Sequence, residues 1–524
     1  MASRKLICLE FNELCPSLLD RWMGEGKLPN FRRFYQGSSV FTAVAEEENP
    51  ANLEPWIQWY SLHTGRPNSE HRVFHLTDGP KAGHNDVWRM LMDGSRKVFN
   101  CGSMNAKQLD SPGAMFLPDP WCTSEKVSPS ELEPYQKFIS SQVQENSAGG
   151  ENPLSKGDAL RFLWFMATHG LSFDTVKSIV SQLVDEKTAG QDVRWRRAAL
   201  LDRMQSDVFA HYWRGERPDF STFFLNSTAH FQHAYWHCAF PDQFEERAPQ
   251  ADIDRFQGAI FYGYQMMDRL LERFFALEQE GATLMLTTAL SQHANTGSDM
   301  MFYRPRDVQE ILGPLGVKPI RILPVMAEQF SARFATQAEA DAAHDKLASL
   351  RTEGGRQVFD FSRAPALHVF FGCGIRAKLG GSAVIEGLEG QPKFFDVFRI
   401  LPSTKSGRHH PDSVLWMKAG QAQVHNAKVS ILDILPTILD FFGVDIRRVD
   451  PQGELRGTSL LPAVEGRAPV RSGVLLTEQV KESRYGELVN KKHLGGLSEG
   501  EAGELADLDR ELVVLAAPHA KSGV

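Results

Sequence analysis

Carboxylate, amide and imidazole side chains stand at the ends of several apolar runs in this sequence. Glu10 lies near the end of the run KLICLEF, and Asn226 closes the run FSTFFLN. Gln292 and His293 follow the run ATLMLTTAL. A further acid, Glu54, stands directly before a proline in the stretch NLEPWIQWYSLHTG. Because such groups bind metal ions or transfer protons, we expect them to belong to one functional site.

The apolar runs predict the strands that would position these side chains. They occupy residues 5–11, 220–226, 282–290 and 413–420, and helix-like segments separate them. Continuous apolar strands that alternate with helices are typical of a sheet covered on both faces, and hence of an α/β fold. In such sheets the carboxyl ends of the strands face the ligand crevice. We therefore expect the candidate residues to meet at one edge of a central, mostly parallel sheet.

The chain divides into a core and three additions. We assign residues 1–125, 215–310 and 400–480 to the α/β core. Residues 126–214 are rich in helix formers and predict a helical insertion, whereas residues 317–400 show a strand-helix-strand pattern that suits a small α+β cap. Residues 481–524 form a polar C-terminal extension, whose far end we expect to be loosely held.

Length and charge exclude some classes of function. The chain has 524 residues and a net charge of −8 that is spread along it, without a basic block. We therefore expect no nucleic acid polymer as a partner. The amino terminus lacks the apolar run of a signal peptide, and no segment approaches the roughly 20 apolar residues of a membrane span. These features predict a cytoplasmic protein without a membrane span, and they leave its oligomeric state open.

The cysteines do not suggest a metal site. None of them forms a CxxC pair, so we expect reduced and mostly buried thiols rather than disulfides or a thiolate zinc site. The six are Cys8, Cys15, Cys101, Cys122, Cys238 and Cys373.

Several motifs together resemble the alkaline phosphatase superfamily, particularly its type I phosphodiesterase and nucleotide pyrophosphatase branch. They follow the order of that family along the chain. They are LICLEF, GEGKLPNFRRF (24–34), EPWIQWYSLHTGRPNSEHRV, NSTAH (226–230), SQHA (291–294), GRHHPDS (407–413), VSILDILPTILDFFGV (429–444) and GTSLLP (457–462). The resemblance implies an alkaline-phosphatase-like three-layer sandwich and an enzyme that hydrolyses phosphate or sulfate esters of small molecules.

The resemblance also implies a site with two metal ions, in which the cations bind the ester oxygens and activate the nucleophile. The implied ligands of one cation are Asn226, His230 and His409, with His410 as the alternative to His409. Those of the other are Glu10, Gln292 and His293. Asn12 and His233 would contact these ligands and hold them in place, without binding the cation themselves. The implied cofactor is a divalent metal, with Zn²⁺ as the first choice in one or two sites, and with Mn²⁺ or no metal as alternatives.

The implied site departs from the family at its charged positions. Three aspartates of the family appear here as Glu10, Asn226 and Gln292, so two negative charges are lost, and neutral ligands offset the charge of two cations less well. Glu54 stands where the family places its threonine or serine nucleophile, and Asn52 is the next candidate. Glu54 could be a nucleophile, a base, a metal ligand or only a partner of the helix dipole.

Three functions remain open at this point. The first is a metal-dependent hydrolase or transferase that acts on a phosphate or sulfate ester. The second is an enzyme of the same fold that uses acid-base chemistry by Glu54, Glu10 and the histidines on a different bond, with one metal or none. The third is a non-catalytic binding protein derived from the family, which the cost of keeping buried polar groups argues against.

Overall fold

The computed structural model describes residues 4–467 apart from 48–52, 75, 77, 123, 149–153, 246, 297–300, 325–328, 363–365 and 402–405, and beyond them residues 503 and 505. The candidate Asn52 lies outside the described residues, as does nearly all of the C-terminal extension 481–524.

A nine-stranded, mostly parallel sheet forms the centre of the molecule, which confirms the predicted α/β class. β1 (Leu6–Phe11) lies between β5 (Phe220–Leu225) and β6 (Thr283–Thr287), parallel to both. β3 (Val98–Cys101) and β4 (Met115–Leu117) continue the sheet beyond β5. Beyond β6 follow β17 (Asp412–Met417), β2 (Ser39–Val44), β18 (Gln423–Val424) and β19 (Val429–Ser430). Only β17 runs antiparallel to its neighbours among these described strands.

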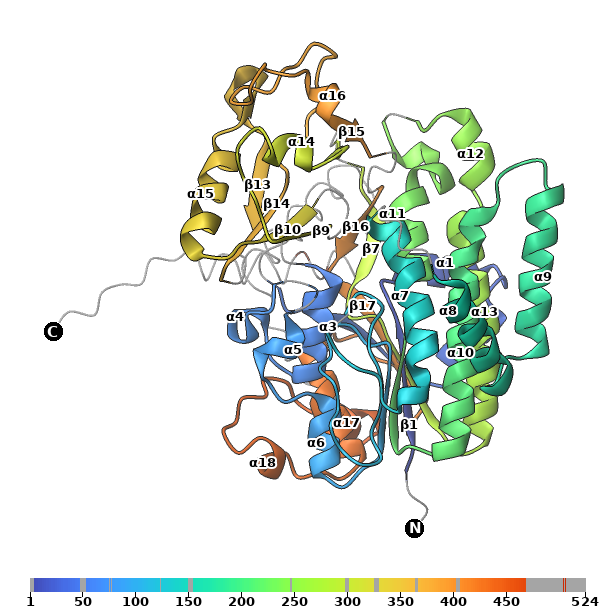
Figure 1. The fold of residues 1–524 in the computed structure, drawn as a ribbon. Coiled ribbons are helices and arrows are strands. Elements are labelled where there is room, and N and C mark those ends of the chain that lie inside the picture. Colours follow the sequence, from blue (N-terminus) through green and yellow to red (C-terminus); the bar gives the residue numbers. More distant parts are fainter. Residues whose placement is uncertain are drawn as a thin grey trace.

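Helices cover both faces of the sheet because successive side chains of a strand point to opposite sides. In β1, Ile7 and Leu9 face one hydrophobic cluster, and Leu6 and Cys8 face another. The first cluster contains α1 (Pro16–Gly24), α2 (Pro29–Gln36), α10 (Arg197–Glu216), α11 (Ser227–Ala239) and α13 (Ala259–Gln279). The second contains α3 (Pro55–Thr64), α6 (Val87–Asp93), α17 (Ile434–Phe441) and α19 (Leu461–Val464). The fold is therefore three-layered (Figure 1).

Short helices connect these elements. They are α4 (Asn68–His71), α5 (Gly79–Ala82), α12 (Gln250–Phe256) and α18 (Ile446–Val449), with 3₁₀ turns at Pro241–Gln243 and Ile431–Asp433. The described cysteines, six in all, are buried and form no disulfide, as the sequence predicted. No helix in the described part of the chain is long and apolar enough to cross a membrane.

A group of helices precedes and includes α10. It consists of the 3₁₀ turn Ser130–Leu132, α7 (Glu133–Ala148), α8 (Lys156–Thr168), α9 (Phe173–Thr188) and the 3₁₀ turn η3 (Arg194–Arg196). Serine residues cap two of these helices: Ser155 accepts a hydrogen bond from the backbone N–H of Asp158, and Ser172 accepts one from that of Thr175. Such N-caps satisfy free backbone donors and set where the helices begin.

A separate lobe lies beyond the carboxyl-terminal end of the sheet (Figure 1). Its strands β9 (Arg321–Pro324), β10 (Gln329–Arg333), β13 (Phe359–Ser362) and β14 (His368–Cys373) form an antiparallel sheet in the order β13-β14-β10-β9. Around it lie β8 (Tyr303–Pro305), α14 (Gln309–Leu312), α15 (Gln337–Ala348), β11 (Arg351–Thr352), the 3₁₀ turn Glu353–Gly355, β12 (Arg356–Gln357), α16 (Phe394–Val397) and β15 (Phe398–Ile400). The lobe has its own hydrophobic cluster of buried side chains, from Tyr303 to Phe398.

Two short strands join the lobe to the core. β7 (Ser291–Ala294) precedes the lobe, and β16 (Gly407–His410) follows it. They pair antiparallel, with His409 opposite Gln292 and His410 opposite Ser291. This ladder therefore lies where the chain enters and leaves the lobe, and it carries several of the candidate residues.

Candidate metal centre

Glu13, His233 and His409 form a compact group of potential metal ligands. Glu13 follows β1, His233 lies on α11, and His409 lies on β16. Glu13 Oε2 is 3.2 Å from His233 Nε2 and 3.4 Å from His409 Nε2. The ligand atoms of the three residues all lie within 4.8 Å of one another, and the Glu13 side chain is buried. Three elements that are distant in sequence thus meet at the end of β1.

The second nitrogen of each imidazole lies near an oxygen acceptor. His233 Nδ1 is 3.1 Å from the carbonyl oxygen of Gly407, and His409 Nδ1 is 3.5 Å from Glu54 Oε2. With a cation bound, Nδ1 of each ring would carry the proton next to these oxygens, and Nε2 would offer its lone pair beside Glu13. Histidines that bind metals are held in this way by a carbonyl or a carboxylate.

Amide side chains hold the Glu13 carboxylate in place. Asn12 Nδ2 donates to Glu13 Oε1 at 2.8 Å, and Gln292 Nε2 donates to Glu13 Oε2. Burial alone would raise the pKa of Glu13, but the charges and hydrogen bonds of His409 and His233 outweigh it and hold this pKa well below its usual range. Glu13 is therefore an anion whose charge needs cations around it.

This set of residues fits one divalent cation. A carboxylate and two imidazoles are ligands that catalytic zinc sites use, and three protein ligands leave a position open for water or substrate. Glu54 Oε2 is buried and accepts no hydrogen bond from the residues that the structure describes. An unsatisfied buried carboxylate oxygen is costly, so its position beside His409 also favours a site in which a cation or a proton is nearby.

Glu54 is directed to this centre rather than to its own helix. It is the residue before α3, and its backbone oxygen accepts from the N–H groups of Ile57 and Gln58, each at 3.0 Å. Its side chain makes no capping hydrogen bond to the helix. The carboxylate is instead 3.5 Å from His409 Nδ1 and is about a quarter exposed (26%). The geometry therefore gives Glu54 a more specific partner than the helix dipole.

The ligand set implied for one cation, Glu10, Gln292 and His293, is not brought together. Glu10 Oε1 is 2.8 Å from His63 Nε2 of α3, and both side chains are buried. Gln292 and His293 are neighbours on β7, so their side chains point to opposite faces of that strand. Gln292 reaches Glu13, whereas the ring of His293 lies 4.0 Å from that of His410, between centroids.

The other implied set, Asn226, His230 and His409, is also divided. Asn226 Oδ1 accepts a hydrogen bond from Asn12 Nδ2 at 2.8 Å, and His230 faces a neighbouring cavity. On α11 it is His233, three residues after His230, that reaches Glu13. His409 lies at the centre, and His410, its alternative, lies on the other face of β16.

Sequence reasoning missed Glu13. The stretch LEFNEL contains two acids three residues apart, and only the second lies beyond the end of β1. The rule that ligands bind outside the carboxyl ends of strands could have indicated it. Sequence reasoning gave Asn12 and His233 a supporting role; in the structure Asn12 contacts Glu13, while His233 is itself in a ligand position.

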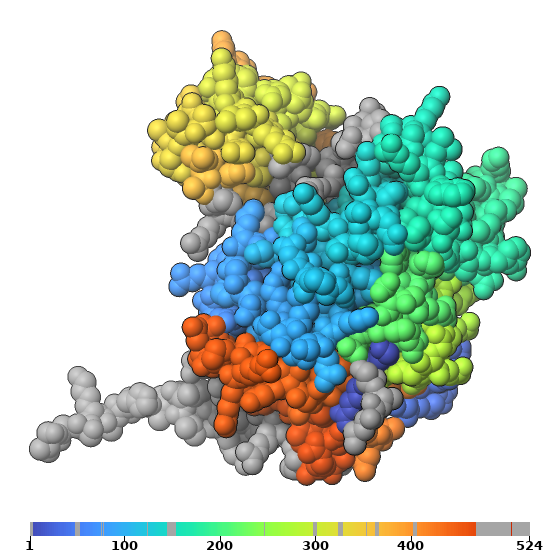
Figure 2. Space-filling view, turned by 60° about the horizontal axis from the view of Figure 1, so that its bottom comes forward, coloured from blue at the N-terminus to red at the C-terminus, as the bar shows by residue number. Residues whose placement is uncertain are grey.

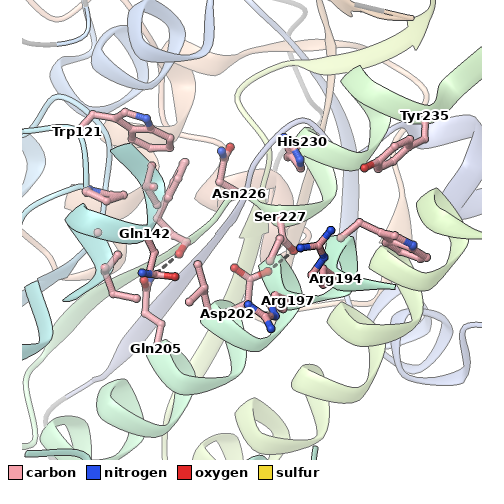
Figure 3. A pocket seen from close by; sticks show the side chains of 18 of the residues that line it. Trp121, Gln142, Arg194, Arg197, Asp202, Gln205, Asn226, Ser227, His230 and Tyr235 are labelled. Atoms are coloured by element: carbon pink, nitrogen blue, oxygen red, sulfur yellow. Dashed lines mark hydrogen bonds between the residues drawn. The ribbon is translucent and has the colours of Figure 1, made fainter. Parts of the chain in front are cut away.

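A cavity of about 570 Å³ adjoins this centre on the side of the helical group (Figure 3). Asn226 and His230 line it, and Asn226 connects it to Glu13 through Asn12. Its aromatic lining residues are Trp121, Trp195, Phe224 and Tyr235, and its polar ones include Gln142, Asp192, Arg194, Arg197, Asp202, Gln205 and Ser227. Arg194 and Arg197 are paired with Asp192 and Glu186, so the cavity combines aromatic surface with largely balanced charge.

Solved structures with a similar fold include several hydrolases. Phosphonoacetate hydrolase from Sinorhizobium meliloti 1021 matches with 13% identity and a TM-score of 0.39 over 84% of this chain and 96% of that chain. Phosphonate monoester hydrolase from Silicibacter pomeroyi matches with 12% identity and a TM-score of 0.41, over 89% and 77%. Murine ectonucleotide pyrophosphatase/phosphodiesterase 5 matches with 9% identity and a TM-score of 0.41, over 88% and 99%.

No family model matches the chain, and no curated protein matches its sequence. At such low identities a likeness concerns the fold alone, and we therefore base the function of this chain on the geometry of its own site.

Proposed function

We propose that this protein is a metal-dependent hydrolase of phosphate or sulfate esters of small molecules, with one divalent cation held by Glu13, His233 and His409. One observation carries the proposal: the three ligand atoms lie within 4.8 Å of one another. The oxygen atoms next to both Nδ1 atoms support it, because they favour the proton at Nδ1 and direct Nε2 of each ring toward the other ligand atoms. The ordered motifs of the sequence support the choice of ester.

Zn²⁺ is the cation that this ligand set suits best. A cation bound here supplies Lewis acidity, which polarises an ester oxygen and lowers the pKa of water. The protein contributes the arrangement around it. Asn12 and Gln292 fix both oxygens of the Glu13 carboxylate, and the carbonyl oxygen of Gly407 orients the His233 imidazole. Such preorganisation keeps the reacting groups in place without a cost at the moment of reaction.

Glu54 is the proposed general base. Its Oε2 is buried and accepts no hydrogen bond from the described residues, so it is available to take a proton from the attacking water. The proton then resides on Oε2, beside His409 Nδ1. The organic part of the ester occupies the adjoining cavity, where Trp121, Trp195 and Tyr235 offer aromatic surface.

Metal analysis of two neighbouring histidine variants tests the centre. After loading with Zn²⁺ and dialysis, we expect about one equivalent of metal in the wild type, because the described residues contain one compact ligand group. His409→Ala should lose this metal. His410→Ala is the matched control, because His410 lies on the opposite face of the same strand. Equal metal content in both variants would show that the centre is wrongly assigned.

Activity measurements test the reaction separately. Wild-type protein and Glu54→Gln should be compared on aryl phosphomonoester, phosphodiester and sulfate substrates, with the metal content of each sample measured. Loss of a general base lowers turnover by roughly 10²- to 10⁴-fold, and we expect the metal content to be unchanged. If metal-loaded wild type cleaves none of the three ester classes, the hydrolase proposal fails even though the metal centre stands.

A further inference from the structure

Two consecutive helices expose an unusual amount of apolar surface. Of the eleven large hydrophobic side chains that are exposed in the described part of the chain, eight lie on α8 and α9. They are Leu160, Leu163, Trp164, Phe173, Val176, Val180, Leu183 and Val184. Single exposed apolar residues are common, but a concentration of this kind marks a surface that contacts something else. We call these eight side chains the α8–α9 patch.

The patch forms one face on each helix. On α8, Leu160, Leu163 and Trp164 are three and four residues apart, which places them on the same side. On α9, Phe173, Val176, Val180, Leu183 and Val184 follow the same spacing. The opposite sides of both helices pack inward through side chains such as Phe162, Phe165 and Gln182. Each helix thus turns apolar side chains to solvent in addition to the side that packs inward.

The patch lies at an outer edge of the molecule. α9 is the outermost helix on the side away from the lobe (Figure 1), and the teal and green residues of this stretch project there in the space-filling view (Figure 2). Phe173 and Trp164 are the most exposed large hydrophobic side chains that the structure describes, at 80% and 73%. They stand on either side of the short turn between α8 and α9.

Most of the charged side chains beside the patch that form no ion pair with a described residue are lysines. Lys156 is four residues before Leu160, Lys177 is four after Phe173, and Lys187 is four after Leu183, so each shares a face with apolar side chains. None of these lysines is ion-paired with a described residue. The acids of the two helices are largely engaged. Asp158, Asp185 and Glu186 pair with Lys137, Arg196 and Arg197, which leaves Asp174 as the exposed acid.

We propose that the α8–α9 patch binds the surface of a membrane that contains anionic lipids. Its apolar side chains would enter the boundary between headgroups and acyl chains, while the lysine amines reach the lipid phosphates. The net charge of the whole chain is −8, so attraction by overall charge does not explain such binding, and the local lysines must provide it.

A second copy of this chain fits the patch less well. In a two-fold symmetric dimer the same patch meets itself, which would bring the lysines of both copies together. Three of the four acids on the two helices already pair with other residues of the same chain, and Asp174 alone does not balance three lysines. A lipid surface supplies the missing negative charge. The protein would bind at the membrane surface and not across it, since no described helix could span a membrane.

Co-sedimentation with lipid vesicles tests the proposal on the full-length protein. The probes are vesicles of pure phosphatidylcholine and of equal parts phosphatidylcholine and phosphatidylglycerol. We expect roughly tenfold tighter binding to the mixed vesicles, and a strong decrease of that difference at high salt. The variant Trp164→Glu with Phe173→Glu should bind mixed vesicles at least about tenfold more weakly. Ile320→Glu is the matched control, since Ile320 is 65% exposed but lies in the lobe.

A second variant separates charge from apolar contact. Lys177→Gln with Lys187→Gln should weaken binding to mixed vesicles by roughly tenfold to thirtyfold and leave binding to pure phosphatidylcholine unchanged. If circular dichroism shows that the variant Trp164→Glu with Phe173→Glu has lost its fold, the lysine variant alone decides whether the patch binds the membrane. The proposal is overturned if wild type fails to bind mixed vesicles, or if both variants bind like wild type. It is equally overturned if wild type is a dimer in the ultracentrifuge and the glutamate variant is a monomer.

Discussion

Glu13 owes its place in the centre to an unusual backbone conformation. Its φ is 60°, in the left-handed region that residues other than glycine rarely adopt. The chain turns there directly after β1, which directs the carboxylate toward His233 and His409. Strained conformations of this kind persist where the surrounding contacts hold them, and they concentrate at functional sites. A sequence pattern of apolar runs contains no signal for such a turn, which is why Glu10 was favoured.

Substitution of each acid in turn distinguishes the ligand implied by the family, Glu10, from the proposed ligand, Glu13. Glu13→Gln keeps the shape of the side chain but removes the charge, so we expect the affinity for Zn²⁺ to fall by roughly 100-fold or more. Glu10→Gln is the control, because Glu10 pairs with His63 instead, and it should change the affinity little. Equilibrium dialysis with Zn²⁺ measures both. A loss with Glu10→Gln alone would favour the ligand set implied by the family.

Gly407 permits the close contact between Gln292 and β16. A Cβ atom at this position would lie 2.4 Å from Gln292 Oε1 and 2.7 Å from the backbone oxygen of Gln232. Gly407→Ala should therefore displace Gln292 and lower both metal affinity and stability, the latter by about 1–3 kcal/mol. Gly381→Ala, where a Cβ meets no atom within 4 Å, is the control. Thermal unfolding with and without Zn²⁺ measures the two effects, and equal behaviour of the variants would contradict this account.

At the scale of elements, the sequence predicted where candidate residues occur better than which way they point. The strands before Glu10 and Asn226 are present, and α3 begins at the predicted proline. The alternation of side chains on β7 and β16 then decides which residues face the centre. It directs Gln292 and His409 toward Glu13 and turns His293 and His410 away. That register depends on the pairing of two strands that the lobe separates in the sequence, which local sequence does not reveal.

The segment that follows α3 contains a histidine that must remain neutral. His71 Nε2 is 2.8 Å from Ser61 Oγ, and Nδ1 accepts from the N–H of Val73 at 3.0 Å. Burial, and then repulsion by His84 and Arg66, lower the pKa of His71 to about 3. Because this value lies below that of an unfolded histidine, protonation favours the unfolded state. The stability that neutral His71 contributes is present above pH 6.5 and is lost as the pH falls toward 3.

Denaturant unfolding at two pH values tests this coupling. Between pH 7 and pH 5 the wild type should lose about 2 kcal/mol of unfolding free energy through His71. His71→Gln should be less stable at pH 7 but should lack this part of the pH dependence. His344→Gln, at an exposed position of α15, is the control and should follow the wild type. An unchanged pH dependence in His71→Gln would mean that other groups account for the acid sensitivity.

At the scale of the whole molecule, the proposed cation would connect segments from distant parts of the chain. Glu13, His233 and His409 lie on elements that are assembled only in the folded state. A ligand that binds only the folded state stabilises it by mass action, by about 2.7 kcal/mol at 100 times its Kd. The alternation of apolar strands with helices predicted the α/β class. Three segments so far apart in the sequence could not be grouped into one site without the fold.

Removal of metal should therefore lower the thermal stability of the protein. We expect the Tm of Zn²⁺-loaded wild type to fall on addition of a chelator and to recover when Zn²⁺ is restored. His409→Ala should show neither change, whereas His410→Ala should behave as the wild type does. Differential scanning calorimetry measures these midpoints. A chelator that lowers the Tm of His409→Ala as much as that of the wild type would contradict a stabilising cation at this centre.

The pairing of β7 with β16 brings the two ends of the lobe together. Ala294 lies opposite Gly407, so the chain leaves the core and returns to it at adjacent positions. A short turn could connect these two residues and leave Gln292 opposite His409. The lobe could thus be exchanged or enlarged over evolution without altering the register of the residues that face Glu13. Changes in the lobe can therefore proceed without disturbing the residues that are proposed to hold a cation.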